Sequence, residues 1–143
     1  MMGIFVALIS GALMSIQGVL NTAVTKSTSM WVSASWVQFT ALLTCLLIWG
    51  ISDRQNLLGV FQVQPRYMLL GGVIGAFITF TVIQSMSSLG PAKAVMLIVI
   101  SQLIVAYAIE LLGLFGAEKA TLEWRKVIGM AVAVVGVILF KWE

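Results

Sequence analysis

Five long apolar stretches, separated by short polar segments, occupy most of the 143-residue chain. Each is about as long as a helix needs to cross a bilayer, because about 20 residues at about 1.5 Å per residue span a hydrocarbon core of about 30 Å. The pattern predicts an all-α integral membrane protein in which the whole chain, 1–143, forms one transmembrane domain. The expected spans are approximately residues 3–24, 31–51, 67–88, 92–115 and 125–141.

The first stretch, Gly3 to Val24, has no charged residue but carries polar side chains on one flank. At about 100° per residue, Ser10, Gln17 and Asn21 lie within about 20° of one direction. Polar groups at mid-membrane depth need partners, because hydrocarbon offers neither donors nor acceptors. Two interpretations remain open. The amides bond to a neighbouring helix, or they line the path of a substrate.

The fourth stretch contains the only acidic residue within any predicted span, Glu110. Gln102, Ala106 and Glu110 lie along one helical stripe about 80° wide. If Glu110 faces the interior of a bundle, desolvation favours its neutral form, and the residue becomes a candidate for proton coupling. If it reaches the interface, it is a solvated carboxylate. The sequence leaves both positions open.

Glycines recur at helical spacing in the third and fifth stretches. The third opens with Gly71 and Gly75, and the fifth carries Gly129 and Gly136. Small residues let the backbones of membrane helices approach closely, so these four positions are predicted to pack against other helices. The dipeptide Gly90-Pro91 predicts a break, with Pro91 beginning a new helix.

Composition narrows the classes of function. The chain is 61% hydrophobic and 9% charged, which is too poor in charge for a soluble domain. It has no histidine, and Cys45 is its one cysteine, which excludes Cys/His metal sites and intrachain disulfides. The sequence offers no nucleophile–base pair and no phosphate-cradling loop. We therefore expect no enzyme, no cofactor, no metal and no nucleic-acid partner, and we expect membrane lipid around the chain.

The charged loops give only a weak orientation signal. With five spans, the loops on the side of the N-terminus carry Arg54, Arg66, Lys119, Arg125 and Lys126. The opposite side carries Lys26, Lys93 and Lys141. Loops rich in lysine and arginine stay in the cytoplasm, so this excess weakly favours a cytoplasmic N-terminus. A bias this small permits insertion in both orientations.

Several segments together resemble a known family. They are GALMSIQGVLN (11–21), GGVIGAF (71–77), SLGPAKA (88–94), SQLIVAYAIELLGLFG (101–116) and WRKVIGMAVAVVGVIL (124–139). In this order and spacing they are similar to the YdcZ-like family, a five-span branch of the drug/metabolite transporter superfamily. The resemblance covers nearly the whole chain and implies a helical bundle in the inner membrane of a bacterium.

The resemblance also implies a transport function. Larger members of the superfamily join two five-span halves of opposite orientation, so this chain is expected to form half of a ten-helix antiparallel homodimer, or of a heterodimer with a similar five-span chain. By position, Gln17, Asn21, Gln102 and Glu110 are the expected cavity residues. Ser10 joins them on the polar flank of the first span.

The main hypothesis is a small secondary transporter that exports a small polar or cationic metabolite by alternating access, with Glu110 as the candidate for coupling to a proton or cation. Two alternatives remain. One is a dual-orientation channel for an ion or solute, and the other is a membrane subunit that does not itself transport.

Overall fold

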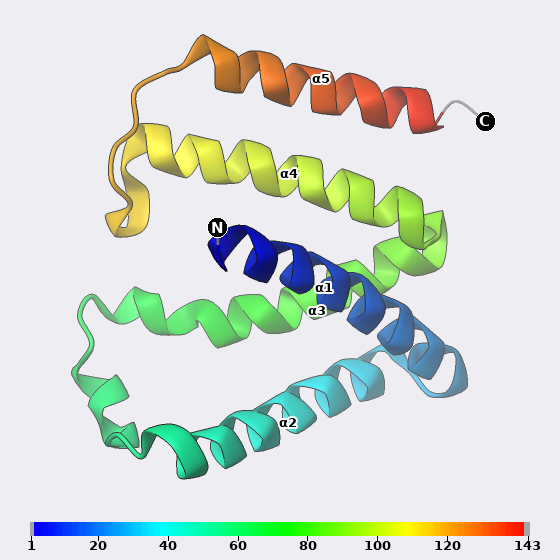
Figure 1. The fold of residues 1–143 in the computed structure, drawn as a ribbon. Helices are drawn as coiled ribbons and strands as arrows, with labels where there is room; N and C mark the ends of the chain where they lie inside the picture. Colours follow the sequence, from blue (N-terminus) through cyan, green and yellow to red (C-terminus); the bar gives the residue numbers. More distant parts are fainter. Residues whose placement is uncertain (1, 142–143) are drawn as a thin grey trace. The chain divides into compact units, whose positions relative to one another are not determined.

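The computed structural model describes residues 2–141, and within this range the chain forms helices and loops with no strand. Its five α-helices are α1 (Met2–Ser27), α2 (Met30–Ile48), α3 (Gly71–Leu89), α4 (Pro91–Leu112) and α5 (Trp124–Lys141), labelled in Figure 1. The all-α prediction is confirmed for this range. The chain divides into two units, one up to Ser88 and one from Leu89, and each is described by itself.

Four of the described helical segments are long and apolar enough to cross a membrane: Met2–Ser27, Met30–Asp53, Arg66–Leu89 and Pro91–Leu112. By length and composition, these segments are consistent with the predicted membrane protein. Helix α5 differs because its 18 residues include Arg125, Lys126 and Lys141, which flank the apolar run 127–140. A fifth span therefore stays a prediction.

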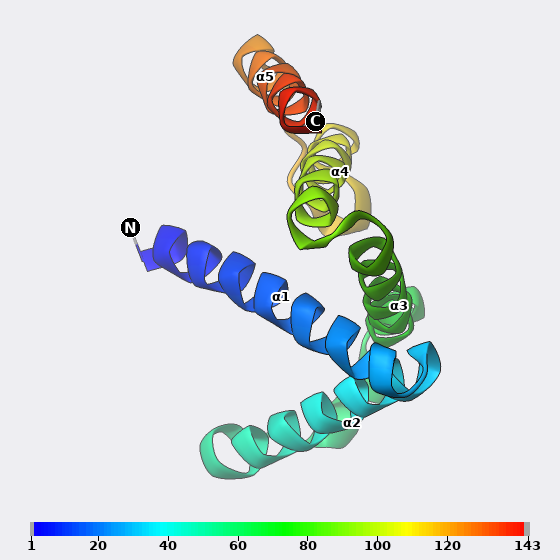
Figure 2. The same ribbon diagram turned by 90° about the vertical axis from the view of Figure 1, so that its right-hand side faces the viewer.

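The first unit begins with a hairpin of α1 and α2. The two helices leave a short turn at Thr28-Ser29 and diverge from it, as Figure 2 shows. The Ser29 hydroxyl caps α2 by accepting a hydrogen bond from the backbone N–H of Val32, at 3.3 Å. Helix α1 runs to Ser27, beyond the predicted end at residue 24. Its last two turns include Thr25, whose hydroxyl is satisfied by donating to the carbonyl of Asn21 at 2.9 Å.

Between α2 and α3 the chain forms short helical turns instead of a plain loop. A π-helical turn, Trp49–Asp53, follows α2, and two 3-10 turns come next, η2 (Leu57–Gln62) and η3 (Arg66–Leu70). Helix α2 therefore ends at Ile48, before the predicted residue 51, and the α-helical part of α3 begins later than the predicted residue 67.

Helix α3 packs against both helices of the hairpin within the first unit. The rings of Trp31 and Phe80 stack at 5.0 Å between centroids. Ile83 and Met86 are buried, whereas most large apolar side chains of the unit point outward. Such an apolar exterior suits a helix surrounded by lipid, because lipid tails are as apolar as leucine.

The second unit consists of α4 and α5. Gly90 has φ +80°, and Pro91 occupies the start of α4, which confirms the predicted break. Helix α4 ends at Leu112 and not at the predicted residue 115, because Gly113 adopts the left-handed conformation and its N–H returns to the carbonyl of Glu110. Helix α5 lies beside α4 and runs antiparallel to it (Figures 1 and 2).

Candidate functional site

One face of α1 carries three of the predicted site residues. Ser10, Gln17 and Asn21 all line a single open groove along this helix, and the other lining residues are apolar. They are Val6, Ile9, Leu13, Met14, Ile16 and Leu20. Because α1 is one unbroken helix, the sequence spacing translates directly into a shared face. The groove is thus an apolar trough with a polar stripe along it.

The two amides of the groove differ in their surroundings. Asn21 is only 8% exposed, whereas Gln17 is exposed. The backbone carbonyl of Asn21 accepts the hydroxyl of Ser33, from α2, at 2.9 Å. Ser33 itself is fully buried. Asn21 therefore lies at the inner end of the groove, where α1 meets α2, and the interhelical hydrogen bond uses its backbone.

Ser33 was not among the residues singled out from the sequence. The signal that could have found it is the shortness of the Thr28-Ser29 turn. A turn of two residues brings the ends of two helices together, so a small polar residue one turn into α2 lies close to the last two turns of α1.

Gly18, next to Gln17, is where α1 approaches α3. A Cβ atom at this position would lie 2.5 Å from Cε and 2.6 Å from Sδ of Met86, and 3.3 Å from Cγ1 of Val82. The contact requires glycine or a shift of the Met86 side chain. Gly18 thereby sets the distance between α3 and the helix that carries the groove.

The four predicted packing glycines have different surroundings. A Cβ atom at Gly75 would lie 3.7 Å from Nε2 of Gln38, which belongs to α2. Cβ atoms at Gly71, Gly129 and Gly136 would meet no atom within 4 Å among the described residues. Gly75 therefore faces another helix of its own unit, and the packing role of the other three stays a prediction.

In the second unit, Gln102 and Glu110 lie on α4 with exposed side chains. Glu110 is within the last turn of the helix, where the chain folds back. Its backbone carbonyl accepts the N–H of Gly113 at 3.3 Å and the N–H of Ala120 at 2.9 Å. Glu110 thus lies near the end of α4, beside the following polar segment, and its role as coupling group or as solvated carboxylate stays a prediction.

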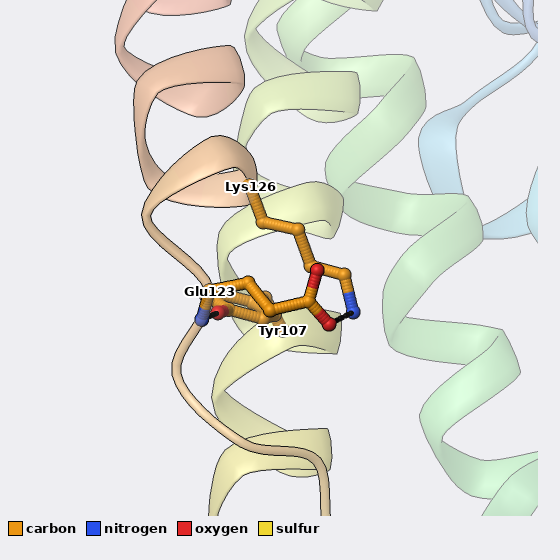
Figure 3. A network of polar contacts seen from close by, with 3 residues as sticks. All are labelled: Tyr107, Glu123 and Lys126. Carbon is orange, nitrogen blue, oxygen red and sulfur yellow. Dashed lines mark hydrogen bonds and ion pairs between the residues drawn. The ribbon is translucent and has the colours of Figure 1, made fainter.

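A polar cluster ties that segment to α4, as Figure 3 shows. Tyr107 is 7% exposed, and its hydroxyl accepts the backbone N–H of Glu123 at 2.9 Å. The Glu123 carboxylate pairs with the Lys126 ammonium at 3.2 Å, and this ammonium lies 5.7 Å from the centre of the Tyr107 ring. Lys126 precedes the apolar run of α5. Its hydrogen bond to Glu123, and then the charge of Glu123, raise the pKa of Lys126 above its ordinary value.

Tyr107 was also missed from the sequence. The signal available was a tyrosine in the last turns of an apolar stretch, followed by a segment rich in charge. A buried tyrosine hydroxyl needs a hydrogen-bond partner, and the nearest polar segment supplies one.

Comparison with known proteins identifies the chain's family. None of the curated proteins and none of the solved structures matches it. A family described as "Putative inner membrane exporter, YdcZ" matches residues 2–139, which is nearly the whole chain. Export is a transport function and not an enzyme class. The match confirms the resemblance seen in the sequence, and the chain therefore belongs to the YdcZ family of inner-membrane exporters.

Proposed function

We propose that the chain is a small secondary transporter that exports a small polar or cationic solute across the inner membrane of a bacterium. The observation that carries this proposal is the groove on α1, where Ser10, Gln17 and Asn21 form a polar stripe and every other lining residue is apolar. A surface that faced only lipid would gain nothing from such a stripe, because lipid tails offer no hydrogen bonds.

The position of the groove near the middle of the membrane-spanning helix supports a transport role. Helix α1 runs from Met2 to Ser27, so Gln17 lies about 4 Å from its middle and Ser10 about 7 Å on the other side. Secondary transporters hold their cargo near the midplane of the bilayer, between halves of opposite orientation. The groove is lined by α1 alone, so in this proposal a second five-span chain closes it from the other side.

In the proposed mechanism, a dimer alternates between two arrangements that open the groove to opposite faces of the membrane. The amide oxygens of Gln17 and Asn21 accept hydrogen bonds from the solute, and the amide N–H groups donate to its acceptors. Glu110, in the last turn of α4, is the proposed coupling group: in the assembled dimer it faces the interior, where desolvation favours its neutral form, and it binds a proton or cation in exchange for the solute.

The test uses purified protein in proteoliposomes, after a thermal-shift screen of small polar and cationic metabolites has supplied a solute. Gln17→Ala should lower uptake at low solute concentration by roughly two- to tenfold, the effect of one lost hydrogen bond. Gln84→Ala removes the same amide from α3, outside the groove, and should leave uptake unchanged. Equal uptake by the two variants would reject the proposed lining.

The coupling group is tested in the same vesicles with an imposed pH gradient. Glu110→Gln keeps the shape of the side chain but cannot exchange a proton, so gradient-driven accumulation should be lost while solute exchange persists. Undiminished accumulation would remove Glu110 from the mechanism. Passive flux far above about 10³ per second would indicate a channel instead of a carrier, because carrier turnovers are comparable to those of enzymes.

A further inference from the structure

The middle part of the segment between α2 and α3, residues 54–66, has an unusual composition for a connecting loop. Arg54 and Arg66 stand at its two ends, and no charged residue lies between them. The hydropathy pattern alone indicates a polar segment between two apolar stretches. The structure places η2 (Leu57–Gln62) within it, visible between α2 and α3 in Figure 1.

The geometry of η2 separates its apolar and polar residues. A 3-10 helix has three residues per turn, so residues three apart lie on the same face. One face carries Leu57 and Val60, and a second carries Leu58 and Phe61. Only the third face, with Gly59 and Gln62, is free of large apolar side chains. Leu58 is 67% exposed and Phe61 is 71% exposed, so the described chain does not cover the apolar faces.

The segment is held at the surface of the membrane by its two ends. The spanning candidate before it is Met30–Asp53, and the one after it is Arg66–Leu89. Twelve residues separate these two segments, so the connection emerges from the bilayer and re-enters on the same side. Its exposed apolar side chains therefore lie within reach of the lipid headgroups.

Several polar backbone groups of the segment are already paired. The N–H of Gly59 bonds to the carbonyl of Asn56 at 3.0 Å, and the Asn56 side chain accepts the N–H of Leu58 at 3.0 Å. At the end of α2, the indole N–H of Trp49 donates to the carbonyl of Gln55 at 2.8 Å. A segment can enter the boundary of the hydrocarbon when its polar backbone groups are already paired.

The charges at the two ends complement lipid phosphate. Arg54 uses Nε to bond to the carbonyl of Gly50 at 2.8 Å, and the guanidinium group carries further N–H donors on its Nη atoms. Arg66 begins η3 at the other end. With Asp53 as the neighbouring acid, the stretch 53–66 has a net positive charge. Guanidinium groups match the oxygens of a phosphate in geometry and charge.

From these observations we infer that residues 54–66 form an interfacial segment that docks on the phospholipid surface. The two apolar faces of η2 insert at the boundary between headgroups and acyl chains, the face with Gly59 and Gln62 points to water, and Arg54 and Arg66 bind lipid phosphates. This docking fixes the neighbouring ends of α2 and α3 at the membrane surface. It is independent of the solute that the chain carries.

The test measures the depth of single labelled positions in the full chain. Cys45 is free and exposed, so it is first changed to serine. Phe61→Cys and Gln62→Cys are labelled separately with a small fluorophore and reconstituted in vesicles of phosphatidylethanolamine with phosphatidylglycerol as the minor component. Quenching is measured with lipids brominated near the headgroup, and with iodide present on both sides of the membrane.

The label at position 61 should be quenched mainly by brominated lipid, and the label at position 62 mainly by iodide, with a difference of roughly twofold or more. Iodide quenching at both positions would place η2 in water and overturn the inference. Protection of position 61 from both quenchers would also overturn it, because the apolar face would then be covered by protein.

The arginines are tested in the variant labelled at position 61. Arg66→Gln should shift the ratio of inserted to water-exposed label by roughly fivefold towards water, the effect expected for one basic residue at an anionic surface. Lys119→Gln makes the same change of charge in the second unit and should leave the ratio unchanged. Equal ratios in the two variants would refute the phosphate contact.

Discussion

Gly18 determines how closely α1 can approach α3 in the first unit. The space where its side chain would begin is already occupied by the thioether end of Met86. Methionine is flexible and can move aside for a methyl group, but it cannot make room for a branched side chain without displacing the helix. The position of the groove relative to α3 thus depends on one missing Cβ atom.

We therefore expect Gly18→Leu to lower the free energy of unfolding by about 1–3 kcal/mol, the usual effect of overpacking. Gly11→Leu is the matched control, because Gly11 lies on the same helix and a Cβ atom there would meet nothing within 4 Å. Thermal unfolding of the two purified variants in the same detergent checks this. A midpoint that falls equally in both variants would contradict the assigned contact.

The polar flank of α1 could be predicted from residue spacing, because a regular helix converts a spacing of seven or four residues into a shared face. The different surroundings of Gln17 and Asn21 could not. They depend on where α2 leaves α1 after a two-residue turn, and on the Ser33 hydroxyl that reaches the carbonyl of Asn21. Neither the direction of α2 after the turn nor the hydrogen bond from Ser33 to Asn21 gives a periodic pattern in the sequence.

At the scale of whole elements, the segment between α4 and α5 is attached to the end of α4 at two points. The N–H of Ala120 bonds to the carbonyl of Glu110, and the N–H of Glu123 bonds to the hydroxyl of Tyr107. Both bonds use backbone groups of the segment, so they hold its path whatever side chains it carries. This attachment positions the start of α5.

Tyr107→Phe should release the second attachment, since it removes the acceptor but keeps the ring. Amide exchange in residues 117–123 should become roughly two- to tenfold faster. Lys126→Gln breaks only the exposed ion pair with Glu123 and should have a smaller effect, because exposed ion pairs contribute little. An exchange rate that changes more in Lys126→Gln than in Tyr107→Phe would contradict this account.

The helices could be predicted from the length of the apolar stretches, but the residues at which they end could not be predicted as well. Gly113 ends α4 before the apolar run ends, because a left-handed glycine closes the helix with its own N–H. Helix α1 continues past the first apolar run to Ser27, and the hydroxyl of Thr25 is satisfied there by the carbonyl of Asn21. Hydropathy records neither effect, since it averages over a window longer than a turn.

At the scale of the whole molecule, the assembly depends on orientation in the membrane. The five-span count remains a prediction, because the apolar run of α5 is short and is flanked by three basic residues. The antiparallel dimer also remains a prediction. A charge bias as weak as this one permits insertion in both directions, and dual orientation stays a prediction. The assembly could not be derived from the chain, because an interface between copies needs the second copy.

Dual orientation has a direct test. In the Cys45→Ser background, Thr121→Cys places a thiol in the segment before α5 without altering the charge bias. An impermeant maleimide added to intact cells should label roughly half of the molecules, and cells opened before labelling should show complete reaction. Full labelling of intact cells, or none, would establish one orientation and exclude an antiparallel homodimer.

The short turn between α1 and α2 has a mechanical consequence. The bond from Ser33 to the carbonyl of Asn21 holds α1 beside α2 at this end, so it acts as a fulcrum for any tilting of α1. Ser10 is eleven residues away, about 16 Å along the helix axis. A tilt of about 10° would swing Ser10 through about 3 Å while Asn21 stays almost still. Tilting of α1 would thus displace the end of the groove that carries Ser10, while the Asn21 end stays beside α2.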